Sequence, residues 1–158
     1  MPSGLRSITR RRLVSGGAGV IVTAAAASTS SGASEVHRHR VVFQVDSADE
    51  AVMRHAISGS LNVSRSYSEK NEPFAIEILA NASGIALFRQ DKSPLLDALT
   101  MLRQAIPEIS LTICGSSKSI AEQREGHELQ LVEGTTVVPY GVVRLIELQE
   151  AGWCYIHA

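Results

Sequence analysis

The sequence predicts an α/β protein: a three-layer α/β/α domain with a five-stranded, mainly parallel sheet. Short runs of β-branched and other apolar residues recur along the chain, and amphipathic segments of helical length separate them. Several of these runs are continuously apolar, as expected of strands that are buried on both faces. Strands that alternate with helices pair in parallel through right-handed crossovers, and this alternation indicates the fold class.

The first 33 residues have the layout of an export signal, so we do not expect them to belong to this domain. They contain four arginines and no acidic residue, followed by a short apolar, glycine-rich stretch and then small residues. The segment Thr9–Val14 resembles the twin-arginine consensus, with Leu13 where phenylalanine is usual. We expect cleavage after Ala33, with a site after Ala27 as the second possibility. A disordered basic tail and an uncleaved anchor are the alternative interpretations.

Removal of the signal would leave an acidic protein in an extracytoplasmic or periplasmic location, with no membrane span. The remainder has 11 basic residues against 16 acidic ones, hence a net charge of −5. It keeps no basic face for nucleic acid, and about 125 residues suit one domain. Residues 34–39 read as a polar lead-in to a domain over 40–158. His37 and His39 lack a third ligand nearby, so we predict no metal site there.

The first half of the domain contains two strands around a long helix. Residues 40–45 and 74–80 are compact apolar runs that we interpret as strands. Between them, a capping box of Ser47 and Glu50 predicts the start of an amphipathic helix over roughly 48–68.

The middle of the domain is expected to add two helices and the third strand. Residues 83–88 predict a short helix, and 94–102 another, with Pro94 as its first residue. Residues 109–114 alternate between apolar and small polar side chains and predict the third strand. A Ser/Lys-rich helix follows and ends at Gly126.

The last third of the domain predicts two more strands around one helix. Residues 135–138 are a short β-branched run, and 142–150 are amphipathic, with Gly152 closing that helix. Residues 153–157 predict a final short strand.

Cys114 is the candidate functional residue. As the last residue of the third strand it would face the crevice where parallel α/β sheets hold their ligands. The free N–H groups of the following helix and the charge of Lys118 would favour the thiolate. The alternative is a structural residue, because cysteine is among the most buried residue types.

Other residues follow strand ends at the same edge and would form one pocket with Cys114 if the sheet is parallel. These residues are Asp46, Asn81, Gly115, Lys118, Pro139 and Tyr140. A helix start and a turn explain Asp46 and Asn81 equally well. No histidine is visibly paired with Cys114, which argues against a Cys-His hydrolase. No glycine-rich phosphate loop follows a strand, so no cofactor is predicted.

The carboxyl-terminal residues closely resemble the DsrE/DsrF-like family, whose members end in a "TVVPxGVxxLxxLQxxGWxYI" motif. The matching stretch here is residues 134–156, GTTVVPYGVVRLIELQEAGWCYI. The Cys114-Gly115 pair matches the family's cysteine position after the third strand, and residues 41–45 match its first strand. The resemblance therefore covers nearly all of the predicted domain.

The resemblance implies a five-stranded parallel sheet, homo-oligomers and kinship with sulfur-relay subunits. In such subunits the cysteine at the position of Cys114 carries a persulfide and exchanges sulfur with a donor or acceptor protein. A non-catalytic oligomeric binding or scaffold subunit is the alternative. Cys154 stands where the family commonly has alanine, so the motif gives it no role.

The two cysteines and the apolar helices allow two further expectations. Two cysteines in an exported protein can form a disulfide. In the family's topology, however, the third and fifth strands are not neighbours, so we expect two free thiols, with Cys114 near a crevice and Cys154 largely buried. The apolar helices around Leu87-Phe88 and Val142-Val143 suggest surfaces that a homo-oligomer would cover.

Overall fold

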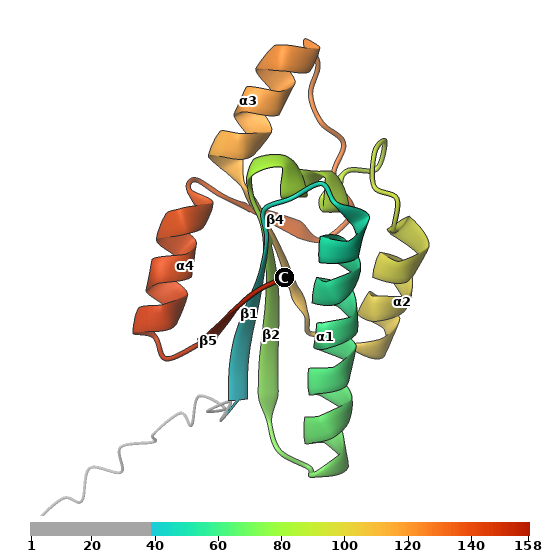
Figure 1. The fold of residues 1–158 in the computed structure, drawn as a ribbon, viewed down its shortest axis with the longest axis vertical. Coiled ribbons are helices and arrows are strands. Elements are labelled where there is room, and N and C mark those ends of the chain that lie inside the picture. The colour runs from blue at the N-terminus through green and yellow to red at the C-terminus, as the bar shows by residue number, and fades with distance from the viewer. Residues whose placement is uncertain (1–38) are drawn as a thin grey trace, which may run out of the picture. The chain divides into compact units, whose positions relative to one another are not determined.

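The computed structural model describes residues 39–158, so the predicted signal and residues 34–38 lie outside the described part. Five parallel strands form one sheet in the order β4-β3-β2-β1-β5 (Figure 1). The strands are β1 (His39–Val45), β2 (Phe74–Ala80), β3 (Ser110–Cys114), β4 (Thr135–Val138) and β5 (Cys154–His157). The helices are α1 (Glu50–Glu69), the 3-10 helix η1 (Ala82–Phe88), α2 (Leu96–Ala105), α3 (Gly115–Glu125) and α4 (Gly141–Glu150). The predicted α/β fold with a five-stranded parallel sheet is confirmed.

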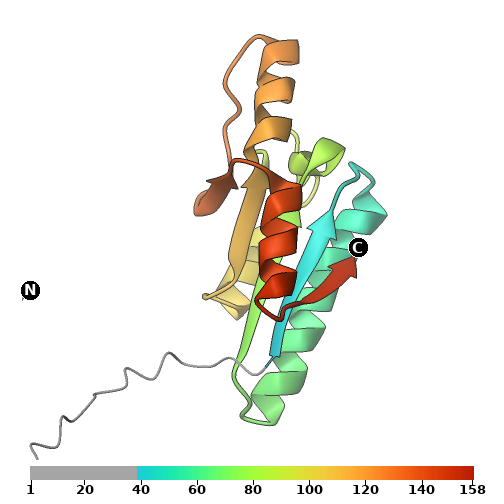
Figure 2. The same cartoon turned by 90° about the vertical axis from the view of Figure 1, so that its left-hand side faces the viewer.

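The helices cover the two faces of the sheet unequally. Figures 1 and 2 show α1 and α2 on one face and α4 on the other, while α3 extends beyond the carboxyl edge of the strands. No residue of α3 is buried. Because parallel strands end at the same edge, the residues that follow β1, β2, β3 and β4 gather where α3 and α4 begin.

The main core lies between the sheet and the layer of α1, α2 and η1. Its fully buried side chains include Phe43, Met53, Ile78, Phe88 and Leu99. The suggestion that Leu87 and Phe88 form an exposed apolar surface is wrong, because η1 turns both side chains into this core.

A smaller apolar cluster lies under α4. It contains Val42 and Leu79 from the sheet and Leu145 and Leu148 from the helix, with Trp153 packed against them. One helix therefore covers this face, and the outer side of that helix is exposed. Val142 and Val143 are exposed there, as the sequence suggested.

The starts of two helices differ from the predictions. Asp49 is the N-cap of α1, and its carboxylate accepts the Ala51 N–H at 2.8 Å. Ser47 accepts the Asp49 N–H instead, and Glu50 pairs with Arg54, so the predicted capping box is wrong. Helix α2 begins at Leu96, after a turn that contains Pro94.

The amino end of β1 is fixed by His39, which the sequence placed in the polar lead-in. Its ring stacks on Tyr67 of α1 at a centroid distance of 3.9 Å. Its Nε2 lies 2.7 Å from the carboxylate of Glu72. These contacts extend the strand by one residue beyond the predicted start. Within residues 39–158, no helix is long and apolar enough to cross a membrane.

Candidate functional site

Cys114 lies where two helices begin. It ends β3 and is the N-cap of α3, and its sulfur accepts the N–H of Gly141, the first residue of α4, at 3.2 Å. Helix N-termini carry free N–H groups and partial positive charge, so both helices favour a negative sulfur. The residue is only 6% exposed. Although buried, Cys114 belongs to neither apolar cluster.

The environment of the sulfur favours the thiolate. Burial raises the pKa of Cys114, but hydrogen bonds from Ser117 and from the Gly141 and Ser116 backbone together outweigh it, so the pKa lies below its ordinary value. Lys118 was expected to supply a positive charge that stabilises the Cys114 thiolate. Its ammonium group instead bonds to Glu122 on the same helix, which compensates that charge. The stabilisation of the sulfur therefore comes from neutral donors.

Asn81 is the neighbour of Cys114 across the sheet. Ala80 pairs with Ile113, so the next residues of the two chains, Asn81 and Cys114, follow at the same level. Gly141 closes over both. A Cβ at that position would lie 3.0 Å from the Cys114 Cβ and 3.4 Å from the Asn81 Cβ. Only glycine lets the start of α4 approach so closely.

Four of the predicted pocket residues line one open groove at the start of α3, and Cys114 is not among its lining residues. Gly115, Lys118, Pro139 and Tyr140 surround a volume of about 460 Å³ between α3 and the β4–α4 connection. Asp46 lies elsewhere, because its carboxylate is 3.0 Å from His157 Nε2 at the end of β5. The functional roles of these residues stay predictions.

A second groove, which the sequence did not predict, lies between η1 and α3. Its volume is about 410 Å³, and Ser83, Ile85, Ser117 and Arg124 are among its lining residues. Ser117 connects this groove to the site, since its hydroxyl accepts the Ala82 N–H at 2.9 Å and the same residue lowers the pKa of Cys114. The Ser/Lys-rich start of α3 was the available signal for this residue.

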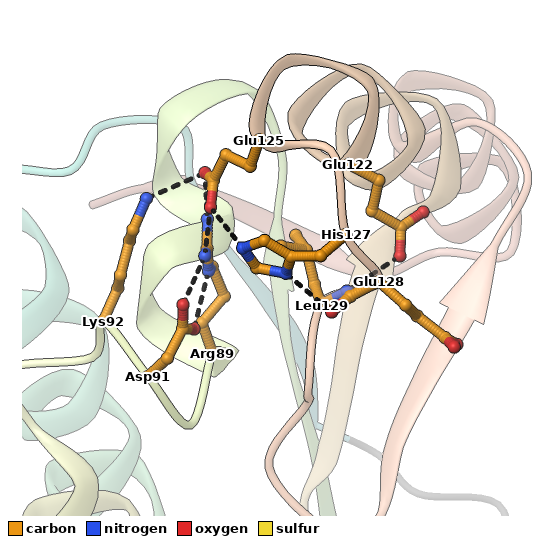
Figure 3. Close-up of polar contacts among 8 residues, drawn as sticks. All are labelled: Arg89, Asp91, Lys92, Glu122, Glu125, His127, Glu128 and Leu129. Atoms are coloured by element: carbon orange, nitrogen blue, oxygen red, sulfur yellow. Dashed lines mark hydrogen bonds and ion pairs between the residues drawn. The ribbon is translucent and has the colours of Figure 1, made fainter.

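A buried arginine ties η1 to the far end of α3 (Figure 3). The Arg89 side chain is 4% exposed and donates to Asp91 at 3.0 and 2.6 Å and to Glu125 at 2.7 and 2.8 Å. Lys92 adds a bond of 2.8 Å to Glu125, and His127 lies 3.5 Å from it. Hydrogen bonds from Arg89 first, and then from Lys92, lower the pKa of Glu125 to about 2.

This network predicts a pH dependence of stability. A depressed pKa makes the Glu125 carboxylate stabilising above its ordinary pKa of 4.5, and the contribution disappears as the pH falls towards about 2. The melting temperatures of wild type and Glu125→Gln should therefore differ most above about pH 5 and converge as the pH falls. Glu128→Gln is the control, because the Glu128 carboxylate contacts none of the other residues drawn in Figure 3. A constant difference between wild type and Glu125→Gln at all pH values would contradict the prediction.

Both cysteines are free thiols, as predicted, because β1 and β2 separate the strands that carry them. The expected burial of Cys154 is wrong: it is exposed, since β5 is an edge strand whose four residues are all exposed. Among residues 39–158, no group of three or more His, Cys, Asp or Glu side chains could hold a metal ion.

No protein-family model matches this sequence, and no curated protein matches it. Two solved structures are similar to it. MTH1491, a protein of unknown function from Methanobacterium thermoautotrophicum, is 29% identical, with a TM-score of 0.61 over 76% of this chain and 99% of its own. BT1422, a conserved protein of unknown function from Bacteroides thetaiotaomicron, is 16% identical, with a TM-score of 0.52 over 75% of this chain and 94% of its own. This chain therefore shares its fold with both proteins.

Proposed function

We propose that this protein is an exported DsrE-like sulfur carrier in which Cys114 forms a persulfide and passes the outer sulfur to a second thiol. The observation that carries the proposal is the sulfur's position at the starts of α3 and α4, where it accepts the Gly141 N–H at 3.2 Å. Donors that stabilise a thiolate also stabilise the anionic persulfide formed from it. The resemblance of residues 134–156 to the DsrE/DsrF-like family supports the same chemistry.

The transfer needs two displacements at sulfur. In the first, the Cys114 thiolate attacks the outer sulfur of a donor such as thiosulfate, the donor's S–S bond breaks, and sulfite leaves with the bonding electrons. In the second, an acceptor thiolate attacks the outer sulfur of the persulfide, and Cys114 leaves as a thiolate. The charges balance in both steps, and neither step requires an external oxidant or reductant.

The burial of the sulfur supports small reactants. Only 6% of Cys114 is exposed, and the nearest open groove is lined by the next residue, Gly115, together with Pro139 and Tyr140. We therefore expect thiosulfate, polysulfide and low-molecular-weight thiols to reach the sulfur more readily than a protein thiol does. A donor or acceptor protein is the alternative partner.

Mass spectrometry after incubation with thiosulfate or polysulfide tests the proposal. Trypsin separates the two thiols, because Cys114 falls on residues 104–118 and Cys154 on residues 145–158. The first peptide should gain one sulfur, about 32 Da, and a reducing thiol should remove it. Cys154→Ala should leave this gain unchanged. Modification confined to residues 145–158, or to neither peptide, would refute the sulfur-carrier function.

Exposed apolar side chains favour a second proposal, that the protein assembles with further copies of itself. Val137, Val142, Val143 and Ile146 are 44–62% exposed on β4 and the outer side of α4. A monomer would leave these apolar side chains in water, and a second copy of the chain would cover them. This surface also suits the alternative function of a non-catalytic oligomeric subunit.

Light scattering should therefore give the mass of a homo-oligomer at micromolar concentration. Val142→Glu combined with Ile146→Glu should shift the protein to the monomer, because both charges would be buried at the contact. Met101→Glu is the matched control, since Met101 is 68% exposed but lies on α2, on the opposite face of the sheet. A monomer mass for the wild type would exclude this assembly.

Export is tested separately, because the signal lies outside the described residues. Arg10→Lys combined with Arg11→Lys should retain the precursor in the cytoplasm, since the twin-arginine route requires the arginine pair. The wild type should be found outside the cytoplasmic membrane, shortened by about 33 residues. Wild-type protein recovered at full length from the cytoplasm alone would contradict the export proposal.

A further inference from the structure

A row of polar side chains crosses the sheet towards Cys114. The Tyr155 hydroxyl of β5 donates to Gln44 Oε1 at 2.5 Å, and Gln44 Nε2 of β1 donates to Asn81 Oδ1 at 3.0 Å. Asn81 follows β2 and stands beside Cys114 at the end of β3. The row therefore joins four neighbouring strands, in the order β5, β1, β2 and β3.

The side chains of this row share the face of the sheet that α4 covers. Side chains alternate along a strand, so residues two apart point to the same side. Gln44 lies two residues after Val42, and Asn81 two residues after Leu79, and both of these apolar residues pack under α4. Tyr155 pairs with Val42 in the sheet register. The whole row thus lies next to the helix whose first N–H contacts the Cys114 sulfur.

The direction of these hydrogen bonds determines which atom of the Asn81 amide is left without a partner. The hydroxyl of Tyr155 occupies the oxygen of Gln44, so the Gln44 nitrogen points to the oxygen of Asn81. This leaves the Asn81 Nδ2 group, for which the described residues provide no acceptor. Neighbouring strands are about 4.8 Å apart, and a Cβ added at Gly141 would lie 3.0 Å from the Cys114 Cβ and 3.4 Å from the Asn81 Cβ, so the two side chains lie beside each other under the start of α4.

We propose that the Asn81 amide binds the negative charge on the Cys114 thiolate and on the outer sulfur of its persulfide. Gln44 and Tyr155 are positioning residues that hold this amide with its nitrogen towards the sulfur. The inference rests on the proposed function of Cys114 and adds a side-chain amide to the Gly141 N–H, which donates to the sulfur at 3.2 Å.

Titration of the thiolate by its ultraviolet absorbance tests this without requiring reagent access. All variants carry Cys154→Ala, so that only Cys114 titrates. Asn81→Ala should raise the midpoint by about one pH unit, because a hydrogen bond to a charged group is lost. Asn81→Asp should raise it further, since it keeps the acceptor for Gln44 but replaces the donor with a negative charge. An unchanged midpoint in either variant would overturn the proposal.

The Tyr155→Phe variant tests whether Tyr155 acts by orienting the Gln44 and Asn81 amides or only supports the structure. It removes one hydroxyl from a side chain that is 40% exposed on the edge strand and cannot itself contact Cys114. We expect a rise of roughly half a pH unit in the Cys114 midpoint, because the amide row loses its fixed orientation. Tyr67→Phe is the matched control, at the other end of the sheet beside His39, and it should leave the midpoint unchanged.

A double-mutant cycle decides whether the effect passes through Asn81. Adding Tyr155→Phe to Asn81→Ala should shift the midpoint no further, since the row no longer ends at the sulfur. Equal shifts with and without Asn81, or no shift for Tyr155→Phe alone, would overturn the positioning role. Failure to form a persulfide alongside these shifts would refute the sulfur-carrier function and leave the role of Asn81 standing. Persulfide formation without any shift of the midpoint would refute the role of Asn81 and leave the sulfur-carrier function standing.

Discussion

Cys114→Ser is expected to abolish the gain of sulfur on residues 104–118 completely and to leave the fold intact. A hydroxyl is not ionised near neutral pH and does not displace a leaving group from sulfur, so the first step of the transfer cannot occur. Serine is nearly isosteric with cysteine, and its oxygen can accept the Gly141 N–H that the sulfur accepts now. Peptide mass spectrometry measures the loss, and circular dichroism checks the fold.

The exposed thiol provides the matched control for this experiment. Cys154 lies on the edge strand and has more contact with solvent than Cys114. If exposure alone decided the reaction, Cys154→Ala would remove most of the added sulfur and Cys114→Ser little of it. The proposed site predicts the opposite. Sulfur that remains on residues 104–118 of the Cys114→Ser protein would show that another group on that peptide carries it.

The order and type of the main elements could be predicted because their sequence patterns are local. The strands at 74–80 and 135–138 have the predicted bounds, since the first is a mostly apolar run that ends before Asn81 and the second a β-branched run that ends before Pro139. The start of α1 was harder, because Ser47 and Asp49 can both cap a helix. The structure selects Asp49, whose carboxylate reaches Ala51 N–H.

The sequence could predict only those residues of the candidate site that directly end or follow a strand. Asn81 lies beside Cys114 because the sheet is parallel and β2 and β3 are neighbours in it. The exposure of Cys154 depends on which strand lies at the edge, and the order of strands cannot be obtained from alternation alone. The same is true of Arg89, whose partner Glu125 lies 36 residues away in the sequence. Contacts of this range have no local pattern.

The second large effect is expected from Gly84→Ala, in the helix η1 that closes the carboxyl edge of β1. A Cβ at this position would lie 2.1 Å from the carbonyl oxygen of Val45 and 2.9 Å from the Asp46 nitrogen. These are backbone atoms, so no side-chain rotation relieves the clash, and η1 must move although Phe88 anchors it in the core. We expect a loss of about 3 kcal/mol in the free energy of unfolding, measured by chemical denaturation.

Gly126→Ala separates this steric effect from the general cost of replacing a glycine. Gly126 has a φ of 75° and no atom within 4 Å of an added Cβ, so its replacement should cost only the strain of the left-handed conformation, about 1 kcal/mol. Because Ala82 at the start of η1 bonds to Ser117, the Gly84→Ala displacement should also raise the pKa of the Cys114 thiol, whereas Gly126→Ala should not. Equal losses of stability in the two variants would mean that η1 adapts to the added methyl group, and that the close packing of Gly84 on β1 does not fix the position of Ser117.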